Sequence, residues 1–181
     1  MGELLTPQEL AKYLKLNPTT LIRKAAKGEI PAIKIGKLFR FDKSQIDRWL
    51  LQKTMGRPLQ ILVVDDEPLI GKLFKDSLEQ CGYQVTTTVS SLKALELATH
   101  RHFDFVFLDL VMPELDGNEL FRRIREIDVH VPIAIITGYP DSDLMSKAME
   151  QGPFLVIKKP LDSDDILEAV HSYAQTTVTR V

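Results

Sequence analysis

The clearest pattern in the chain is a series of short apolar runs in its second part. Four runs contain only apolar residues: Ile61–Val64, Phe105–Leu108, Ile133–Ile136 and Leu155–Ile157. Runs this short and this apolar are typical of strands that are buried on both faces of a sheet. Tyr83–Thr88 is more polar and is expected to be a strand nearer the sheet edge. The second part of the chain therefore predicts a five-stranded sheet.

Helical segments are expected after each of these strands. Their predicted ranges are 68–80, 90–99, 117–127, 141–150 and 163–176. Strands that alternate with helices predict an α/β fold with a parallel, doubly wound sheet. We expect the flavodoxin-like strand order 2-1-3-4-5, in which the first and third strands are neighbours at the switch point.

The first third of the chain shows a different pattern. Thr6 and Glu9 form a capping box, and the helix that they open should run to about Leu14. Asn17 opens a second helix that should end at Gly28. Two short helices joined by so short a turn predict a helix-turn-helix.

A hairpin and a third helix are expected next. Ala32–Ile35 and Leu38–Phe41 flank Gly36-Lys37, which is a two-residue turn between apolar-rich strands. Asp42 and Gln45 then form another capping box at the start of a helix. The first part of the chain is therefore predicted to be a small winged helix-turn-helix domain.

Charge also divides the chain into two parts. Residues 1–57 contain 12 Lys and Arg against 5 Asp and Glu, whereas residues 58–181 contain 11 against 20. A basic first domain is suited to nucleic acid, and an acidic second domain is suited to a cation. The expected domains are a winged helix-turn-helix domain at 1–54, a linker at 55–58, the α/β domain at 59–177 and a tail at 178–181.

The chain contains a single cysteine, Cys81, so no disulfide can form within it. This fits a reducing compartment. The N-terminal sequence MGELLTPQEL lacks the apolar stretch of a secretory signal, and no run is long enough to cross a bilayer. We therefore expect a cytoplasmic protein without a membrane partner.

Five polar residues stand at or just after the ends of the four apolar runs: Asp65, Asp66, Asp109, Thr137 and Lys159. The carboxyl ends of parallel strands lie along one edge of a sheet, where ligands bind. Neighbouring carboxylates repel each other in a partly desolvated pocket, and Mg²⁺, which prefers oxygen ligands, relieves that repulsion. Lys159 adds a charge suited to a phosphoryl oxygen, and Thr137 adds a hydroxyl donor. The set predicts a phosphate and Mg²⁺ site.

Each piece also has a simpler interpretation. The segment Asp65–Pro68 alone could be a helix cap, and Pro113–Gly117 alone could be a turn before a helix. Lys158-Lys159 could be solvated surface charge. We favour the joint site because the pieces occur in order, each at the end of a predicted strand.

Four segments of the second domain carry a family likeness: ILVVDDEP (61–68), FVFLDLVMPELDG (105–117), IITG (135–138) and KP (159–160). Through them, residues 59–177 resemble a response-regulator receiver domain. The resemblance implies that Asp109 accepts a phosphoryl group from a histidine kinase or a phosphotransfer protein. It also implies contacts of Thr137 and Lys159 with the phosphoryl oxygens. The implied Mg²⁺ ligands are Asp65, partly through water, Asp66, Asp109 and the backbone carbonyl of Val111.

Some positions bear on how such a domain would switch. Many receivers have an aromatic residue three positions before the conserved Lys, whereas this chain has Val156 there and Phe154 two residues earlier. We therefore expect the switch to work through Thr137 and its loop rather than through a rotating aromatic side chain. Val111 and Tyr139 flank the site, and the resemblance predicts slow self-dephosphorylation for an apolar and a bulky residue there.

The second helix of the first domain has one apolar and one basic face. The predicted inward face consists of Leu21, Ile22, Ala25 and Ala26. The opposite face of this helix carries basic and hydroxyl side chains, which recognition helices place in the major groove. A basic hairpin can reach phosphates or the minor groove. The expected DNA contacts are Thr19, Thr20, Arg23, Lys24 and Lys27 on the helix, with Lys34, Lys37 and Arg40 on the hairpin. The alternative is a solvated surface or a protein-binding domain.

The first domain also resembles a known family. LTPQELAKYL, TLIRKAAKGEIPAIKIG and RFDKSQIDRWL, within residues 3–53, are similar to excisionase-type, MerR-like winged-helix domains. The resemblance implies that the second helix enters the major groove and that the hairpin is the wing.

Together the patterns predict a two-component response regulator. Phosphorylation of Asp109 would control DNA binding, and hence transcription, with a homodimer formed on phosphorylation. The alternative is a phosphorylation-gated interaction adaptor or phosphorelay intermediate that does not bind DNA. We do not expect a turnover enzyme, because related phosphoaspartate hydrolases use a second Asp where this chain has Val111. The domain would catalyse only its own phosphorylation and dephosphorylation.

Overall fold

The structure is a computed structural model that describes residues 3–178. The chain forms two compact units, of which the second spans Pro58–Tyr173. The expected linker at 55–58 begins inside a helix, because that helix continues to Met55. Of the expected tail, Val178 is the last residue of a helix, and 179–181 lie outside the described residues. Among the described helices, none combines the length and the apolar character needed to cross a membrane.

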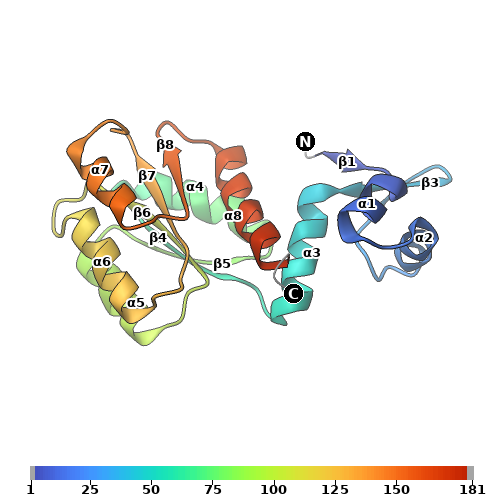
Figure 1. Ribbon diagram of the computed structural model, residues 1–181, viewed down its shortest axis with the longest axis horizontal. Coiled ribbons are helices and arrows are strands. Elements are labelled where there is room, and N and C mark those ends of the chain that lie inside the picture. The colour runs from blue at the N-terminus through green and yellow to red at the C-terminus, as the bar shows by residue number, and fades with distance from the viewer. Residues whose placement is uncertain (1–2, 179–181) are drawn as a thin grey trace. The chain divides into compact units, whose positions relative to one another are not determined.

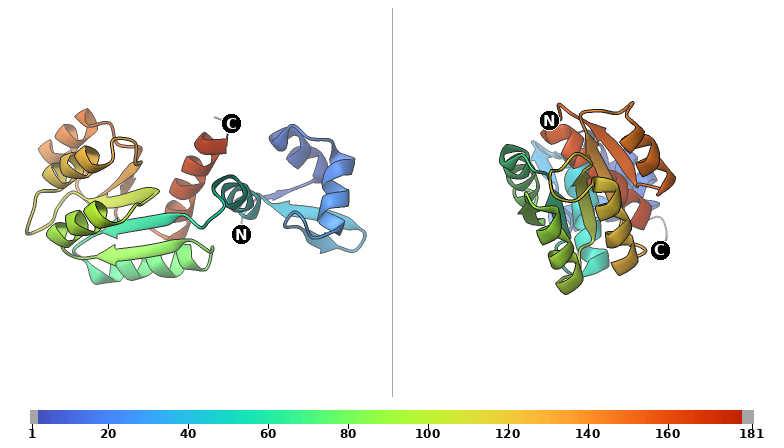
Figure 2. Two further views of the ribbon diagram at one scale, coloured as in Figure 1. Left: turned by 90° about the horizontal axis from the view of Figure 1, so that it is seen from below. Right: turned by 90° about the vertical axis from the view of Figure 1, so that its left-hand side faces the viewer.

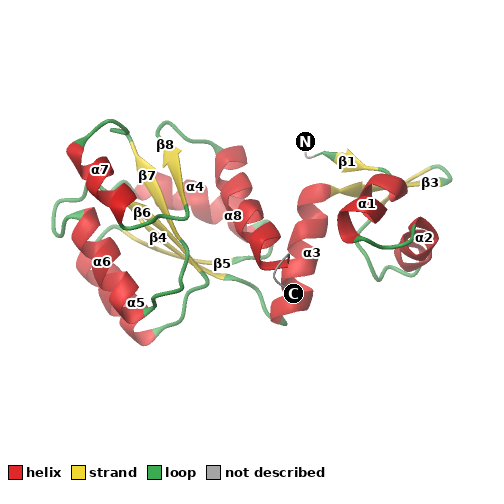
Figure 3. Cartoon of the chain, viewed as in Figure 1, coloured by secondary structure: helices red, strands yellow, loops and turns green. Residues whose placement is uncertain are grey.

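The first unit contains the predicted helices and hairpin. Its elements are β1 (Leu4–Leu5), α1 (Pro7–Leu14), α2 (Pro18–Ala26), β2 (Ile33–Ile35), β3 (Leu38–Asp42) and α3 (Lys43–Met55). The strands form an antiparallel sheet in the order β1-β3-β2. Figure 3 shows the short α1 and α2 next to this small sheet. β1 was not predicted, because two residues are too few to form a hydrophobic pattern.

Local interactions define the helix-turn-helix. Thr6 Oγ1 accepts the Glu9 N–H at 3.2 Å, and Glu9 Oε2 accepts the Thr6 N–H at 2.7 Å, which confirms the predicted capping box. Asn17 Oδ1 caps α2 through the Thr19 N–H at 2.8 Å. Lys15 between the helices has a left-handed φ of 52°. This conformation reverses the chain within three residues and fixes α2 against α1.

The core of the first unit is small. Its buried residues are Leu5, Leu10, Ala11, Leu21, Ala25, Ile30, Phe41 and Ile46. The predicted inward face of α2 is correct for Leu21 and Ala25 but wrong for Ile22 and Ala26, which are exposed. A nine-residue helix on so small a core buries only one i, i+4 stripe, so the adjacent residues face solvent.

A buried carboxylate joins α1 to α3 in the same unit. Asp47, which is 1% exposed, accepts the Tyr13 O–H at 2.5 Å and a hydrogen bond from Lys43 Nζ at 3.1 Å. Lys43 Nζ also lies 5.3 Å from the centre of the Tyr13 ring. A buried charge is tolerated when it is paired in this way, so the three side chains support the packing of α1 on α3.

The second unit alternates strands and helices (Figure 1). Its elements are β4 (Gln60–Val64), α4 (Pro68–Glu79), β5 (Gln84–Thr88), α5 (Ser91–His100), β6 (Phe105–Asp109), α6 (Gly117–Ile127), β7 (Ile133–Thr137), α7 (Asp143–Glu150), β8 (Leu155–Lys158) and the first part of α8 (Ser163–Val178). All strand pairs are parallel, in the order β5-β4-β6-β7-β8. This confirms the predicted doubly wound sheet and the edge position of the second strand.

Helices cover both faces of this sheet. Figures 1 and 2 show α4 and α8 on one face and α5, α6 and α7 on the other. The face under α4 and α8 is rich in aromatic rings: the Phe105 ring lies 4.8 Å from Phe107 and 5.4 Å from Tyr173. Burial on both faces explains why the central strands are wholly apolar. Polar side chains appear where these strands end, at the carboxyl edge of the sheet.

The loop after β6 folds back closely on the strand end. A Cβ added at Gly117 would lie 2.4 Å from the Leu110 Cα and 2.7 Å from the Leu110 carbonyl oxygen. The Gly117 N–H donates to that carbonyl at 3.2 Å. Because only glycine allows so close an approach, this contact fixes the backbone that follows Asp109.

Candidate phosphoryl and metal site

The five residues predicted to share a site lie at one edge of the large sheet. Asp65 and Asp66 follow β4, Asp109 ends β6, Thr137 ends β7, and Lys159 follows β8. A cavity of about 470 Å³ opens at this edge. It is lined by Asp66, Glu67, Asp109, Val111, Gly138, Tyr139 and Lys159.

Lys159 is the centre of the polar contacts. Its Nζ donates to Asp109 Oδ2 at 2.6 Å and to Glu67 Oε1 at 2.8 Å, and it lies 3.0 Å from Asp65 Oδ2. Burial lowers the pKa of Lys159, but hydrogen bonds with Asp109 and Glu67 and the ion pair with Asp65 outweigh burial and raise the pKa above its usual value. The site therefore holds a permanent ammonium group among three carboxylates.

Asp65 is the most deeply buried of these carboxylates. It is 2% exposed, and its Oδ1 accepts the Glu67 N–H at 2.9 Å. Its Oδ2 is buried and has only the ion pair with Lys159, without hydrogen-bond geometry. Burial raises the pKa of Asp65 to about 6, although the hydrogen bond from the Glu67 N–H and the ion pair with Lys159 oppose the shift. A buried carboxylate oxygen with so few partners is a group that a cation would stabilise.

Asp109 is also buried, with 4% exposure, and both of its oxygens are engaged. Oδ1 accepts the Val111 N–H at 2.9 Å, and Oδ2 accepts from Lys159. Oxygens of Asp65, Glu67 and Asp109 all lie within 4.8 Å of one another. Asp66 is exposed and lines the same cavity. An all-oxygen set of this size fits a hard divalent cation such as Mg²⁺.

Glu67 was missed as a site residue in the sequence. The sequence predicts it only as part of a possible helix cap, and it does stand at the N-cap of α4. Its side chain, however, makes no capping hydrogen bond and contacts Lys159 instead. Its position directly after two predicted metal ligands, Asp65 and Asp66, is the feature of the sequence that could have indicated a site residue.

Thr137 faces its own loop. It is 1% exposed, and its Oγ1 accepts the Tyr139 N–H at 3.0 Å. The Lys159 N–H donates to the Thr137 carbonyl at 2.8 Å, so β7 and β8 are joined beside the site.

Phe154 stands at the other end of β8, where its ring meets Phe105 edge-on at 5.6 Å. Phe154 is thus held in the aromatic face, away from Thr137.

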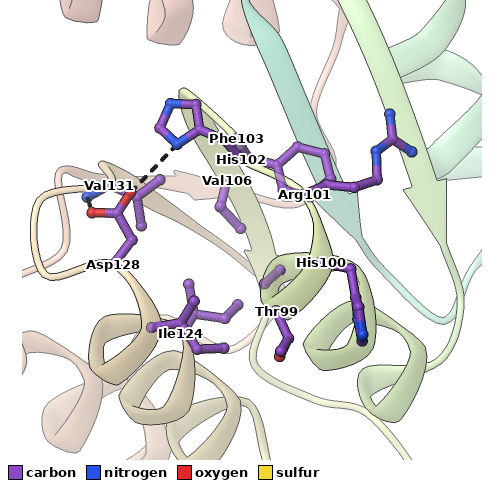
Figure 4. Close-up of a pocket in the computed structure, with 11 residues that line it drawn as sticks. Thr99, His100, Arg101, His102, Phe103, Val106, Ile124, Asp128 and Val131 are labelled. Atoms are coloured by element: carbon purple, nitrogen blue, oxygen red, sulfur yellow. Dashed lines mark hydrogen bonds and ion pairs between the residues drawn. The ribbon is translucent and has the colours of Figure 1, made fainter.

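A second cavity lies at the opposite ends of the strands. It measures about 300 Å³ and lies at the C-terminal ends of α5 and α6 (Figure 4). His102 at its rim lies 3.2 Å from Asp104 and 3.8 Å from Asp128. Because β6 runs from Phe105 to Asp109, this cavity is separate from the site at Asp109.

The structure places the predicted DNA-contacting residues on α2, at its C-cap and on the hairpin. Thr19, Arg23 and Lys27 follow one another at spacings of four and are exposed. Lys24 is half-buried and pairs with Glu29 at 2.9 Å. Thr20 and Arg40 are also half-buried, and Arg40 Nη1 donates to the Phe39 carbonyl at 3.0 Å, whereas Lys34 and Lys37 are exposed.

The hairpin also has an apolar face that was not predicted. Ile33, Ile35 and Leu38 are 39%, 54% and 58% exposed. Ile35 pairs with Leu38, and Ile33 pairs with Arg40, so these side chains share one face of the hairpin. The wing therefore offers both positive charge and exposed apolar surface.

Comparison with known proteins agrees with this architecture. The model of the response regulator receiver domain family matches residues 61–171, and a helix-turn-helix domain model matches residues 4–54. Sporulation initiation phosphotransferase F of Bacillus subtilis (strain 168) is 34% identical over 114 residues, which make up 63% of this chain and 92% of that protein. Transcriptional regulatory protein GlrR of Escherichia coli (strain K12) is 33% identical over 63% of this chain, which spans only 26% of GlrR.

Solved structures are similar over the second unit. A response regulator receiver domain protein from Clostridium thermocellum is 34% identical, with a TM-score of 0.60, and the match covers 67% of this chain and 97% of that one. The receiver domain of sensor histidine kinase PA1611 from Pseudomonas aeruginosa PAO1 shares the fold at 24% identity and a TM-score of 0.59, over 66% of this chain and 98% of that one. That receiver has a magnesium ion coordinated in its active site cleft. The chain described here belongs to the response regulator receiver domain family and carries a helix-turn-helix domain ahead of the receiver.

Proposed function

We propose that phosphorylation of Asp109 controls DNA binding by the helix-turn-helix domain. The observation that carries this proposal is the Lys159 ammonium group, which lies 2.6 Å from Asp109 Oδ2 beside an open cavity. A carboxylate at a cavity, with a fixed positive charge next to it, is suited to accept and hold a phosphoryl group. The donor would be a histidine kinase or a phosphotransfer protein.

The transfer would be a direct displacement. An oxygen of Asp109 attacks the phosphorus of a phosphohistidine, the P–O bond forms, the P–N bond breaks, and the imidazole leaves with a proton from solvent. Lys159 then exchanges Asp109 Oδ2 for a phosphoryl oxygen and neutralises part of its charge. Mg²⁺, held by Asp65, Asp66, Asp109 and the Val111 carbonyl, would add further neutralisation of the phosphoryl oxygens when bound.

The switch would begin at Thr137. Its hydroxyl would give up the Tyr139 N–H and donate to a phosphoryl oxygen, which pulls the loop between β7 and α7 toward Asp109. The two arrangements form an equilibrium, and phosphorylation biases it because only one of them contacts the phosphoryl group. We propose that the biased state is a homodimer, since pairing two small DNA-binding units raises their joint affinity.

Mass spectrometry of the intact protein tests the first step. After incubation with phosphoramidate and Mg²⁺, the wild type is expected to gain the mass of one phosphoryl group. Asp109→Asn should gain none, whereas Asp116→Asn, which alters an exposed carboxylate in the following loop, should gain as much as the wild type. Equal phosphorylation of Asp109→Asn would refute the assignment.

A second candidate function is a phosphorylation-gated adaptor or phosphorelay intermediate. It is favoured by the exposed Ile33, Ile35 and Leu38 on the hairpin, because clustered apolar surface often marks a protein interface. A partner that binds the first domain with little dependence on salt, and loses affinity on Ile35→Ser, would support the adaptor. Salt-sensitive binding to DNA supports the leading proposal instead.

A further inference from the structure

Glu67 is a charged residue of the site that the proposed reaction does not use. Its side chain is 61% exposed, and its Oε1 accepts from Lys159 Nζ at 2.8 Å. At the N-cap of α4 it makes no side-chain capping bond. The Glu67 carboxylate thus contacts the partly buried ammonium group instead of the N-terminus of its own helix.

Lys159 and a divalent cation would compete for the same oxygens. Lys159 Nζ lies 2.6 Å from Asp109 Oδ2 and 3.0 Å from Asp65 Oδ2. Two cations cannot share these oxygens at such distances without strong repulsion. A bound metal would therefore displace the ammonium group from Asp109 and Asp65. Glu67 is the remaining carboxylate that Lys159 already contacts. Its oxygen lies in the same cluster as those of Asp65 and Asp109, but it is not one of the Mg²⁺ ligands proposed above.

We propose that Glu67 is a positioning residue that holds Lys159 at the rim of the cavity while Asp65 and Asp109 bind Mg²⁺. This inference rests on the proposed function of the site. With Glu67 present, the ammonium group keeps one charged partner when the metal binds. Without it, Lys159 depends on the carboxylates that the metal requires, so the affinity for Mg²⁺ falls.

Isothermal titration calorimetry of the full chain with MgCl₂ tests this role. Glu67→Gln is expected to bind Mg²⁺ roughly 5–10-fold more weakly than the wild type, which is within the range of coupling between contacting residues. Glu67→Asp keeps the charge but shortens the reach to Lys159, and it should behave like Glu67→Gln. Glu150→Gln removes the same charge from an exposed position on α7 and should stay within about twofold of the wild type.

A double-mutant cycle identifies the route of the effect. In a Lys159→Met background no ammonium group competes, so Glu67→Gln should change the affinity by less than about twofold. An equal loss in both backgrounds, or a Glu67→Asp variant that binds like the wild type, would overturn the inference. The Glu67→Asp comparison does not depend on whether Lys159→Met folds. A wild type that binds no Mg²⁺ overturns this inference together with the metal part of the proposed function, whereas binding that is insensitive to Glu67 overturns the inference alone.

Discussion

Lys159, which follows β8, and Asp109, which ends β6, share a hydrogen bond of 2.6 Å across β7, although 50 positions separate them in the chain. The contact gives Asp109 a fixed positive partner before any phosphoryl group arrives. Because the ammonium group would neutralise charge that develops during transfer, its removal should affect the reaction more than the fold.

Lys159→Met is therefore expected to slow phosphorylation by phosphoramidate by roughly 100-fold, the usual size for the loss of one charge-stabilising group. The rate of mass gain in the intact protein measures this. Lys158→Met is the matched control, because Lys158 is the adjacent and exposed residue of β8. A Lys159→Met variant that is phosphorylated as fast as the wild type would remove Lys159 from the mechanism.

The raised pKa of Asp65 predicts that the stability of the folded protein changes with pH. Burial raises its pKa in the folded state from 3.8 to about 6. The folded protein thus binds this proton more tightly than the unfolded chain does. The stabilisation that comes from protonated Asp65 is therefore fully present below pH 3.8 and is lost as the pH rises through about 6. Without Mg²⁺, Asp65→Asn should match the wild type near pH 4 and exceed its free energy of unfolding by about 1–3 kcal/mol at pH 7.

Urea unfolding with a chelator present, followed by circular dichroism, measures this difference at each pH. Added Mg²⁺ should reduce the advantage of Asp65→Asn, because the wild-type carboxylate then has a cation to bind. A variant that is less stable than the wild type at pH 7 without metal would contradict the assignment of a destabilising buried charge.

Gly117→Ala should destabilise the second unit by about 1–3 kcal/mol, because the new Cβ would collide with the Leu110 backbone, which cannot rotate away as a side chain can. Gly138→Ala is the control, since a Cβ there meets no atom within 4 Å. Thermal unfolding compares the two. Equal melting temperatures for both variants would show that the loop after β6 relaxes more easily than its contacts indicate.

Tyr13→Phe should destabilise the first unit by about 1–2 kcal/mol, because it removes a hydrogen bond to the buried carboxylate of Asp47. Trp49 is the only tryptophan and packs against the core of this unit, so its fluorescence follows the unfolding of that unit. Tyr139→Phe, in the second unit, is the control and should leave the Trp49 transition unchanged. An unchanged transition for Tyr13→Phe would mean that Lys43 alone suffices for Asp47.

Much of the fold followed from the sequence because its strands are buried on both faces. Runs such as Ile61–Val64 and Ile133–Ile136 have no polar residue, so they could be recognised without knowledge of their neighbours. The approach of Lys159 to Asp109 followed from the same rule, since parallel strands end at one edge. β1 could not be predicted, because its two residues gain their structure only by pairing with β3.

Other features depend on tertiary contacts that no local pattern reveals. Glu67 belongs to the site because it accepts a hydrogen bond from Lys159, which is 92 positions away in the chain. Ile22 was expected to be buried from helical periodicity, but the small core of the first unit covers only the Leu21 and Ala25 stripe. Lys24 was expected to face DNA, and its pairing with Glu29 across the end of α2 was not expected.

If phosphorylation of Asp109 controls DNA binding, fluorescence anisotropy with fragmented DNA should show it. Binding should be measured at two salt concentrations, with and without Mg²⁺ and beryllofluoride, which mimics the phosphoryl group on Asp109. We predict salt-sensitive binding that strengthens with the mimic and is weakened by Arg23→Ala. Lys12→Ala, which removes an exposed lysine from α1 instead of α2, should not weaken it, and Asp109→Ala should no longer respond to the mimic. An absence of DNA binding in both states, or binding that the mimic leaves unchanged, would refute phosphorylation-controlled DNA binding.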